Sequence, residues 1–488
     1  MAKIKLTTKV DSEVLVVGLG LANKKLQIES GAAQLDSATL LATLNAMGAT
    51  AKADEVIKLP GKATKLVVFT GLGEIKSSYE PEVLRRAAGA AARHLNGNKS
   101  ATFSLPHKSV VELAAIAEGA ALGSYTFVEF LGSSKPEQKA PLESISLISK
   151  FSDTAQAKSA IKRAEIIAEQ TYLVRDLINT PPSHLTPDSF SQKMKKLASK
   201  YGVKAEIIND ATLKKSGYGG IIGVGQGSAN PPRLLHVSYS PAKAKKRYAF
   251  VGKGITFDTG GLALKPAAGM EAMKSDMSGA AAVIAAVFAI SQLKLPIAVD
   301  GWAPLAENMV SDNATRPSDV ITIYGGKTVE VLNPDAEGRL VLADALWYTQ
   351  DKYKPQYMID LATLTGAITV ALGFEYAGLF GNDDKLCEML TSAGTKVGEP
   401  LWRLPMGKNY DKDVDSDVAD VKNVGSGRGA GSITAAQFLE RFVNKTPWAH
   451  LDIAGMAWDK KEKPLTGKGA TGYGVRLLNT FLMDNFEG

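Results

Sequence analysis

The sequence predicts an α/β fold in which a smaller N-terminal α/β domain is joined by a long helix to a larger C-terminal α/β domain with a central mixed sheet flanked by helices. Three observations predict it. Apolar strand-like runs alternate with helical patterns along the chain. The 488 residues are 45% hydrophobic, which is enough to bury a large core. A long helical pattern separates two such alternating regions.

The N-terminal domain, residues 1–152, shows this alternation in order. We expect a strand at 13–19, a helical stretch at 39–47, a strand at 65–72, a helix at 82–95, a helix at 110–122 and a strand at 145–149. Each strand run is rich in Val, Ile, Leu and Phe, and each helical run is rich in Ala and Leu.

The connecting helix is expected at 153–179. Its apolar residues recur at helical spacing: Ala160, Ile161, Ala164, Ile167 and Ala168. We expect it to end at Asn179, because the prolines that follow Thr180 remove backbone donors and disfavour helical geometry in the residue before them. The C-terminal domain, 180–488, follows.

Charge and composition exclude several function classes. The net charge of +7 is spread, with 18 basic and 14 acidic residues in 1–150. Its one dense basic run, from Lys243 to Arg247, fits a solvated hairpin turn better than a phosphate-binding patch. A lone Cys387 excludes an intramolecular disulfide framework and a thiolate metal cluster. The five histidines form no HExxH pair, so any metal would be held mainly by oxygen.

The sequence predicts a cytoplasmic protein without a membrane span. No stretch reaches the ~18 consecutive apolar residues that such a span needs, and the N-terminus lacks the apolar region of a secretory signal. Nucleotide-binding loops are also disfavoured. The stretches at 18–20 and 71–73 lack the third glycine of GxGxxG, and the GKT at 326–328 lacks the earlier glycine of a phosphate loop.

A strand-like run beginning at Tyr248 carries the first candidate site residues. Lys253 lies at its centre, and Asp258 lies at its end, where the carboxyl edge of an α/β sheet places ligands. Residues five apart on a regular strand point to opposite faces. The two can therefore share a site only if the backbone bends, for which Gly252 and Gly254 supply the freedom.

Two further segments carry acids. A helical stripe is predicted from Met273 to Phe288, with Asp276 near its beginning, where an acid could simply complement the helix dipole. Asp335, Glu337 and Arg339 are spaced by two and would face one way in extended geometry. A surface ion-pair network would use the same residues.

These segments together resemble the cytosolic leucyl aminopeptidase family of two-metal exopeptidases. The resemblance rests on VGKGITFDTGG, on Lys265-Pro266, KSDMSGAA and NPDAEGRLVLADAL, and on RDLINTPPSHLTP, DLATLTGA, GSITAAQFL, WAHLDIAG and KGATGYG. It covers the whole C-terminal domain in order, and the N-terminal domain agrees in length and pattern.

The resemblance implies a role for each matching residue. It makes Lys253, Asp258, Asp276, Asp335 and Glu337 the ligands of two divalent ions, Mn²⁺ or Zn²⁺, with Asp258 and Glu337 bridging both. It makes Lys265 and Arg339 catalytic, with a bicarbonate ion at Arg339 as general base. The reaction it implies is release of the N-terminal residue of a peptide by attack of a hydroxide that bridges the two metals.

The resemblance also implies a side-chain pocket of mostly small or apolar residues. The matching positions are Met273, Asn333, Ala336, Thr363, Gly366, Ala454 and Ala457. Such a pocket favours aliphatic N-terminal residues such as Leu and Met. Met273 also belongs to the helical stripe, so a structural role is equally open. Thr259 and Ser278 depart from the family pattern, which usually has serine and glycine at these positions.

Quaternary structure and partners follow from the resemblance alone. It implies a homohexamer built as a dimer of trimers, with peptides as substrates. Some similar bacterial proteins also bind DNA, so a DNA-binding accessory or regulatory protein on a peptidase scaffold is the alternative function. The spread of positive charge does not support DNA binding.

Overall fold

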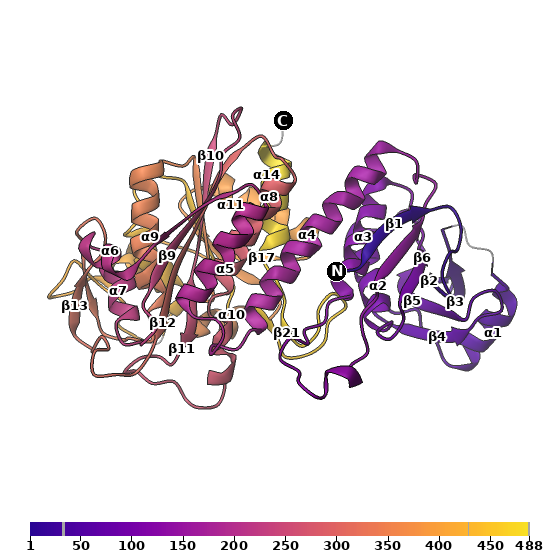
Figure 1. Ribbon diagram of the computed structural model, residues 1–488, viewed down its shortest axis with the longest axis horizontal. Helices are drawn as coiled ribbons and strands as arrows, with labels where there is room; N and C mark the ends of the chain where they lie inside the picture. Colours follow the sequence, from indigo (N-terminus) through magenta and orange to yellow (C-terminus); the bar gives the residue numbers. More distant parts are fainter. Residues whose placement is uncertain (32–34, 428, 487–488) are drawn as a thin grey trace. The chain divides into compact units, whose positions relative to one another are not determined.

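The computed structural model describes residues 1–31, 35–427 and 429–486. The chain forms two compact units (Figure 1). The N-terminal unit comprises Met1–Tyr172 and Asp459–Gly469, and the C-terminal unit comprises Leu173–Trp458 and Ala470–Gly488. Each unit is an α/β structure with its own sheet and its own core, as the alternating sequence pattern predicts.

The N-terminal unit is built on a seven-stranded mixed sheet with the order β1-β7-β6-β2-β5-β4, to which β3 adds by pairing with β2. The strands are β1 (Lys3–Thr7), β2 (Val14–Ala22), β3 (Lys25–Glu29), β4 (Val56–Pro60), β5 (Leu66–Glu74), β6 (Ser100–Ser104) and β7 (Ser144–Ile148). The helices are α1 (Ser37–Ala46), α2 (Pro81–Arg93) and α3 (Val110–Gly123), with a 3₁₀ turn at Lys135–Glu137. Every element predicted in this region is present.

Helices cover both faces of this sheet. Leu44 of α1 packs on one face with Leu15, Val17 and Phe69. Helices α2 and α3 pack on the other face, and they approach so closely that a Cβ at Gly119 would clash with the carbonyl oxygen of Arg85.

A segment from the far end of the chain completes this unit. Leu465 of Asp459–Gly469 is 9% exposed and joins the core formed by α2 and α3. Arg93 at the end of α2 pairs with Glu462 of the segment at 3.1 Å. No pattern in the sequence indicates that this late segment belongs to the N-terminal unit.

Helix α4 (Ala155–Asn179) ends at Asn179, as predicted. Its first half contributes Ala157, Ile161, Ala164 and Ala168 to the core of the N-terminal unit. Its last turns contribute Val174, Leu177 and Ile178 to the core of the C-terminal unit. The boundary between the units, after Tyr172, therefore lies inside this helix.

The C-terminal unit has a nine-stranded mixed sheet with the order β17-β16-β19-β15-β10-β12-β9-β8, and β11 pairs with β12. Its strands are β8 (Lys204–Ile208), β9 (Arg233–Tyr239), β10 (Arg247–Gly252), β11 (Gly254–Asp258), β12 (Ala298–Asn308), β15 (Tyr357–Ala362), β16 (Ala377–Gly381), β17 (Leu401–Arg403) and β19 (Trp448–Asp452). Strands β10, β12, β15 and β19 run parallel, so their carboxyl ends share one edge.

Alternate residues of the central strands face two helical layers. Tyr248 and Phe250 of β10 pack on one side with α5, α8, α11 and α14, and Ala249 and Val251 pack on the other with α7, α9 and α13. The helices are α5 (Pro187–Lys200), α6 (Asp210–Lys215), α7 (Gly219–Gly225), α8 (Ser278–Gln292), α9 (Gly338–Tyr353), α10 (Gly366–Leu372), α11 (Asp384–Val397), α12 (Lys408–Asp411), α13 (Gly431–Glu440) and α14 (Val475–Phe486).

Two smaller sheets complete the C-terminal half. One has the order β13-β14-β18, formed by β13 (Asp319–Thr322), β14 (Thr328–Val331) and β18 (Val421–Lys422), and the other pairs β20 (Trp458–Asp459) with β21 (Gly469–Ala470). Short 3₁₀ helices lie at Met270–Ser275 and Lys412–Val414.

One segment of the described residues, Met270–Gln292, is long and apolar enough to cross a membrane by length and composition. It contains α8, and 89% of its most apolar window is buried inside the protein. The helix lies against the central sheet between β10, β12 and β15, so its hydrophobicity is explained by its place in the core.

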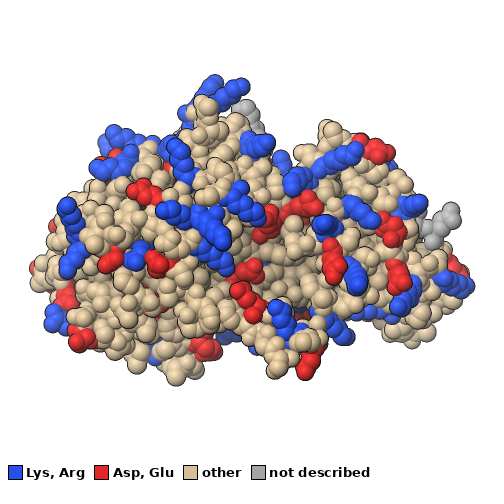
Figure 2. All heavy atoms as spheres, in the orientation of Figure 1, with Lys and Arg blue, Asp and Glu red and all other residues tan. Residues whose placement is uncertain are grey.

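Basic side chains are mixed with acidic ones over the face in Figure 2. Helix α5 exposes lysines while it buries Phe190 and Met194, the usual pattern of an amphipathic surface helix.

Lys243 lies in an exposed turn between β9 and β10, but the predicted hairpin is wrong. Strand β12 lies between these two strands, so the connection crosses over it.

Candidate metal centre

Lys253 lies between β10 and β11. Both strands keep one register along β12, from Val251 opposite Trp302 to Gly254 opposite Leu305, so the bend expected at the glycines beside Lys253 is not seen. The register shifts instead between Ile255 and Phe257, and this one-residue irregularity lets Lys253 and Asp258 face the same side.

The Nζ of Lys253 lies 2.8 Å from Asp276 Oδ2 and 2.8 Å from Glu337 Oε1, and it donates to the carbonyl oxygen of Thr363 at 2.9 Å. The residue is 3% exposed. The buried amine of Lys253, between two core strands, thus contacts Asp276 and Glu337, which come from two other segments.

Asp258 ends β11 and is buried. Strand register places it directly beside Asn308, the last residue of β12. Its Oδ1 accepts hydrogen bonds from the Gly260 N–H and from Asn308 Nδ2, both at 2.8 Å, and its Oδ2 lies 2.8 Å from Lys265 Nζ. Gly260 has a φ of +87°, a conformation that glycine adopts without strain and that the tight turn after β11 requires.

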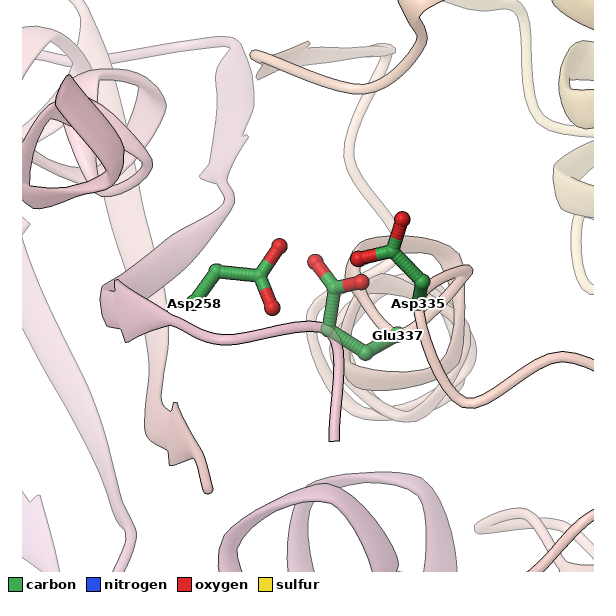
Figure 3. Close-up of side chains that lie close together, drawn as sticks. All are labelled: Asp258, Asp335 and Glu337. Carbon is green, nitrogen blue, oxygen red and sulfur yellow. The ribbon is translucent and has the colours of Figure 1, made fainter. Parts of the chain in front are cut away.

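Asp335 and Glu337 come from the connection between β14 and α9. Ligand oxygens of Asp258, Asp335 and Glu337 lie within 4.8 Å of one another. Figure 3 shows the three carboxyl groups converging from β11 and from the segment before α9. The expected extended geometry of residues 335–339 is wrong, because Asp335 lies in a turn and Arg339 lies in the first turn of α9. The surface-network alternative also fails, since Glu337 is 2% exposed.

Asp276 lies between a 3₁₀ helix and α8, not within the single helix expected from Met273 to Phe288. Its Oδ1 accepts a hydrogen bond from the Thr363 hydroxyl at 2.7 Å, and its Oδ2 faces Lys253. Its carboxylate is therefore directed at the site and does more than complement a helix dipole. The hydroxyl of Ser278 donates to the carbonyl oxygen of Ser275 at 2.5 Å, and that of Thr259 donates to the carbonyl oxygen of Asn308 at 2.8 Å.

Burial and mutual repulsion govern the acids of this site. Burial is the main cause that raises the pKa of Asp276, Asp335 and Glu337. The charge of Asp258 raises all three further, while Lys253 opposes the rise. The buried acids would therefore be stabilised by additional positive charge.

In the two lysines, neighbouring charge and not burial decides the direction of the pKa shift. Burial disfavours their charged form, but the neighbouring carboxylates outweigh burial and raise the pKa of both Lys253 and Lys265. Lys265 pairs with Asp258 and with Asp335 at the more open side of the site.

Arg339 is buried in the first turn of α9. Its Nη1 donates to the carbonyl oxygen of Asn423 at 2.7 Å, and its Nε has no hydrogen-bond partner among the described residues. Burial lowers the pKa of Arg339 to about 10, so the guanidinium remains charged at neutral pH. The structure thus places both predicted catalytic residues next to the cluster, Lys265 by its ion pairs and Arg339 by its position two residues after Glu337.

The seven predicted pocket residues come from four segments. Met273 lies in the 3₁₀ helix before Asp276, Asn333 and Ala336 flank Asp335, Thr363 and Gly366 follow β15, and Ala454 and Ala457 follow β19. Met273 is half-buried and lies outside the buried stripe of α8. Ala457 belongs to the large apolar cluster around α8, and Ala454 packs against the small cluster of Ile368, Phe380, Ile433 and Ala436. That the seven residues line one pocket stays a prediction.

Sequence reasoning missed the polar residues that support the ligands. Asn308 and Asn423 are buried, and both contact segments that carry the acids. Asn308 is the last residue of β12, which pairs in parallel with β11. Asn423 follows β18, which pairs in parallel with β14. An asparagine that closes an apolar strand run, as in GWAPLAEN, was the available signal.

Comparisons with known proteins agree with this architecture. A model of the cytosol aminopeptidase family catalytic domain matches residues 172–479, and a model of the N-terminal domain of the same family matches residues 16–134. Proteins named probable cytosol aminopeptidase are similar over nearly their full length. The one from Streptomyces coelicolor is 45% identical over 96% of this chain and 95% of its own, and one from Rhizobium etli is 42% identical over 95% and 97%.

A solved structure described as the bottromycin maturation enzyme BotP in complex with Mn is 34% identical and superposes with a TM-score of 0.86. The match covers 97% of this chain and 99% of that one. Both family models fall in the order and at the positions of the two units described above. The chain therefore belongs to the cytosol aminopeptidase family, whose members are metal-dependent aminopeptidases.

Proposed function

We propose that this protein releases N-terminal amino acids, preferably leucine and other aliphatic residues, from peptides, with two divalent ions held by Lys253, Asp258, Asp276, Asp335 and Glu337. The observation that carries the proposal is that these five side chains, spread over 85 positions of the sequence, converge in one buried cluster. We place the protein in the cytoplasm, as the name of its relatives indicates.

The donor set fits hard or borderline divalent ions. Four carboxylates without a thiolate suit Mn²⁺, Mg²⁺ or Zn²⁺, and the related BotP was solved with Mn. Burial raises the pKa of Asp276 and Glu337 although Lys253 opposes the rise, so a bound cation would favour their ionised form. An amine can act as a ligand only when it is neutral, and nearby dications would favour that form of Lys253.

Two ions there would polarise the scissile carbonyl and lower the pKa of water, which supplies a nucleophile near neutral pH. Lys265 lies at the exposed side of the acids, where its ammonium can donate a hydrogen bond to an oxygen on which negative charge develops. The buried Nε of Arg339 is an available donor for an anion such as bicarbonate. A bicarbonate held there would take the proton as general base.

Substrate preference would follow from the small and apolar residues near the acids. Burying an aliphatic side chain yields about 0.8 kcal/mol per methylene. A leucine or methionine at the N-terminus would gain more from such a pocket than alanine, and an aspartate would lose hydration without a partner.

Hydrolysis of leucyl-p-nitroanilide tests the proposal directly. We expect EDTA to abolish the activity and Mn²⁺ to restore it, because the acids have no substitute for the removed charge. Alanyl and aspartyl p-nitroanilides, measured in parallel, should give lower kcat/KM than the leucyl substrate. Activity that survives exhaustive chelation, or a folded and Mn²⁺-loaded chain that cleaves no aminoacyl substrate, would refute it.

A further inference from the structure

Two buried asparagines lie beside the ligand-bearing segments without belonging to the proposed ligand set. Asn308 ends β12, which runs parallel to β11 and pairs Asn308 with Asp258. Asn423 follows β18, which runs parallel to β14, the strand before Asp335. Because parallel strands bring their carboxyl ends to one edge, each asparagine arrives next to an acid-bearing connection.

Asn423 holds the connection 332–336 with both ends of its side-chain amide. Its Oδ1 accepts hydrogen bonds from the N–H groups of Leu332 at 2.9 Å and Asn333 at 3.2 Å. Its Nδ2 donates to the carbonyl oxygens of Asn333 at 2.7 Å and Ala336 at 3.3 Å. Asn423 has no exposed surface, so these bonds do not compete with water.

Asn308 holds the same connection from the other side. Its Nδ2 donates to Asp258 Oδ1 at 2.8 Å and to the carbonyl oxygen of Pro334 at 3.1 Å. One amide group thus joins the acid at the end of β11 to the residue that precedes Asp335. The Asn308 carbonyl oxygen in turn accepts hydrogen bonds from the N–H and hydroxyl of Thr259.

The bonds made by these two residues end on the functional groups themselves. Asn308 contacts a proposed ligand, and the carbonyl oxygen of Asn423 accepts the hydrogen bond from Arg339. Together the two asparagines therefore connect Asp258, the segment that carries Asp335, and Arg339.

We infer that Asn308 and Asn423 are positioning residues that fix the separation of Asp258 and Asp335, and so set how tightly the site holds its divalent ions. This inference rests on the proposed metal ligands. Outer residues that orient metal ligands typically change metal affinity by 10- to 100-fold when removed. A carboxylate that loses its orienting partner must instead be ordered by the ion, which weakens binding.

The test is Mn²⁺ binding to the metal-free full-length chain, followed by calorimetry, with leucyl-p-nitroanilide kinetics measured alongside. We expect Asn423→Ala and Asn308→Ala each to weaken at least one Mn²⁺ site by about 10- to 100-fold. Added Mn²⁺ should restore part of kcat in both variants. KM should stay close to its wild-type value in Asn308→Ala, whose lost amide bonds Asp258 and Pro334, and should rise in Asn423→Ala, whose lost amide holds the proposed pocket residues Asn333 and Ala336.

Asn479→Ala is the matched control. Asn479 is also fully buried, but its amide donates to the carbonyl oxygen of Val475 within α14, away from the acids. It should lower the melting temperature without changing Mn²⁺ affinity. If Asn423→Ala does not fold, Asn308→Ala decides, because it removes the amide that joins Asp258 to the Pro334 carbonyl oxygen and leaves the Asn423 bonds in place.

The inference and the proposed function fail in different ways. A wild-type chain that binds no Mn²⁺ overturns the proposed function. A wild-type chain that binds Mn²⁺ as tightly as folded asparagine variants, within threefold, overturns the inference alone.

Discussion

At the scale of single residues, Gly338 leaves the room that the side chain of Lys253 occupies. A Cβ built on Gly338 would lie 2.5 Å from Lys253 Cε and 2.8 Å from its Nζ. Gly338 is the first residue of α9, where alanine is a favourable residue. Glycine at this position therefore avoids a clash with Lys253, whereas the helix itself would be more stable with alanine.

Gly338→Ala should weaken Mn²⁺ binding without unfolding the protein. The added methyl group displaces the amine from Asp276 and Glu337, and we expect a loss of metal affinity on the order of 10- to 100-fold. The melting temperature should hardly change. Gly132→Ala is the control, because no atom lies within 4 Å of the Cβ it would add. Calorimetry on the metal-free chains measures the difference, and equal affinities for Mn²⁺ would contradict this account of Gly338.

Arg339→Ala should reduce kcat more than KM. If the guanidinium holds the anion that accepts the proton, its loss destabilises the transition state and leaves substrate binding unchanged. We expect a decrease in kcat on the order of 10²- to 10³-fold. Arg339→Lys keeps the charge but not the planar fork and should recover little. Added bicarbonate should stimulate the wild type only. Turnover of Arg339→Ala equal to wild type would remove this residue from the mechanism.

At the scale of elements, prediction succeeded where apolar pattern and turn chemistry agree. Helix α4 ends at Asn179 because the prolines after Thr180 enforce it.

Prediction failed where tertiary contacts decide local geometry. Residues 335–339 look extended by their spacing, yet α9 begins at Gly338 because its apolar face packs on the sheet. The candidate ligands came from the family resemblance. The structure brings Lys253, Asp276 and Glu337 together, and their role as metal ligands stays a prediction. Asn423 could not be found, since β18 is only two residues long and carries no pattern of its own.

Helix α3 gives a prediction about pH. Its capping box places the Glu112 carboxylate against the N–H groups of Lys108, Ser109 and Tyr79 and the hydroxyl of Ser78. Burial alone would raise the pKa of Glu112, but these hydrogen bonds outweigh it and lower the pKa.

A lowered pKa contributes stability above the unfolded value of about 4.3, and this stability is lost as the pH falls through the folded value. Glu112→Gln should therefore cost about 1–2 kcal/mol at pH 7. The difference should shrink in acid. Urea unfolding at pH 7 and near pH 4 measures it, with the exposed Glu137→Gln as control. A difference that stays constant with pH would show that the charge of Glu112 does not matter.

At the scale of the whole molecule, exposed apolar side chains bear on assembly. Val370 is 88% exposed, Trp402 58% and Phe374 47%, and they lie in α10, in the edge strand β17 and just after α10. The ring of Trp402 lies 5.8 Å from that of the exposed Tyr376, centroid to centroid, so apolar surface continues from β17 toward the end of α10. Contiguous exposed apolar surface commonly marks an interface between proteins.

We expect the homohexamer that the family resemblance implies. Light scattering should give about six times the 51.6 kDa mass of one chain. Substituting Trp402 or Val370 by lysine should produce smaller species if these residues lie between subunits. A monodisperse monomer at micromolar concentration would contradict this prediction.

The path of residues 459–469 has a consequence for synthesis on the ribosome. The polypeptide leaves the N-terminal unit after Tyr172, and the unit receives its last core side chain, Leu465, only when that late segment emerges. At elongation rates of about 5–20 residues per second, the delay is about 15–60 s. Through that interval the surface of α2 at Gly89, which Leu465 later covers, is exposed on the nascent N-terminal unit, and transiently exposed apolar surface is what chaperones protect.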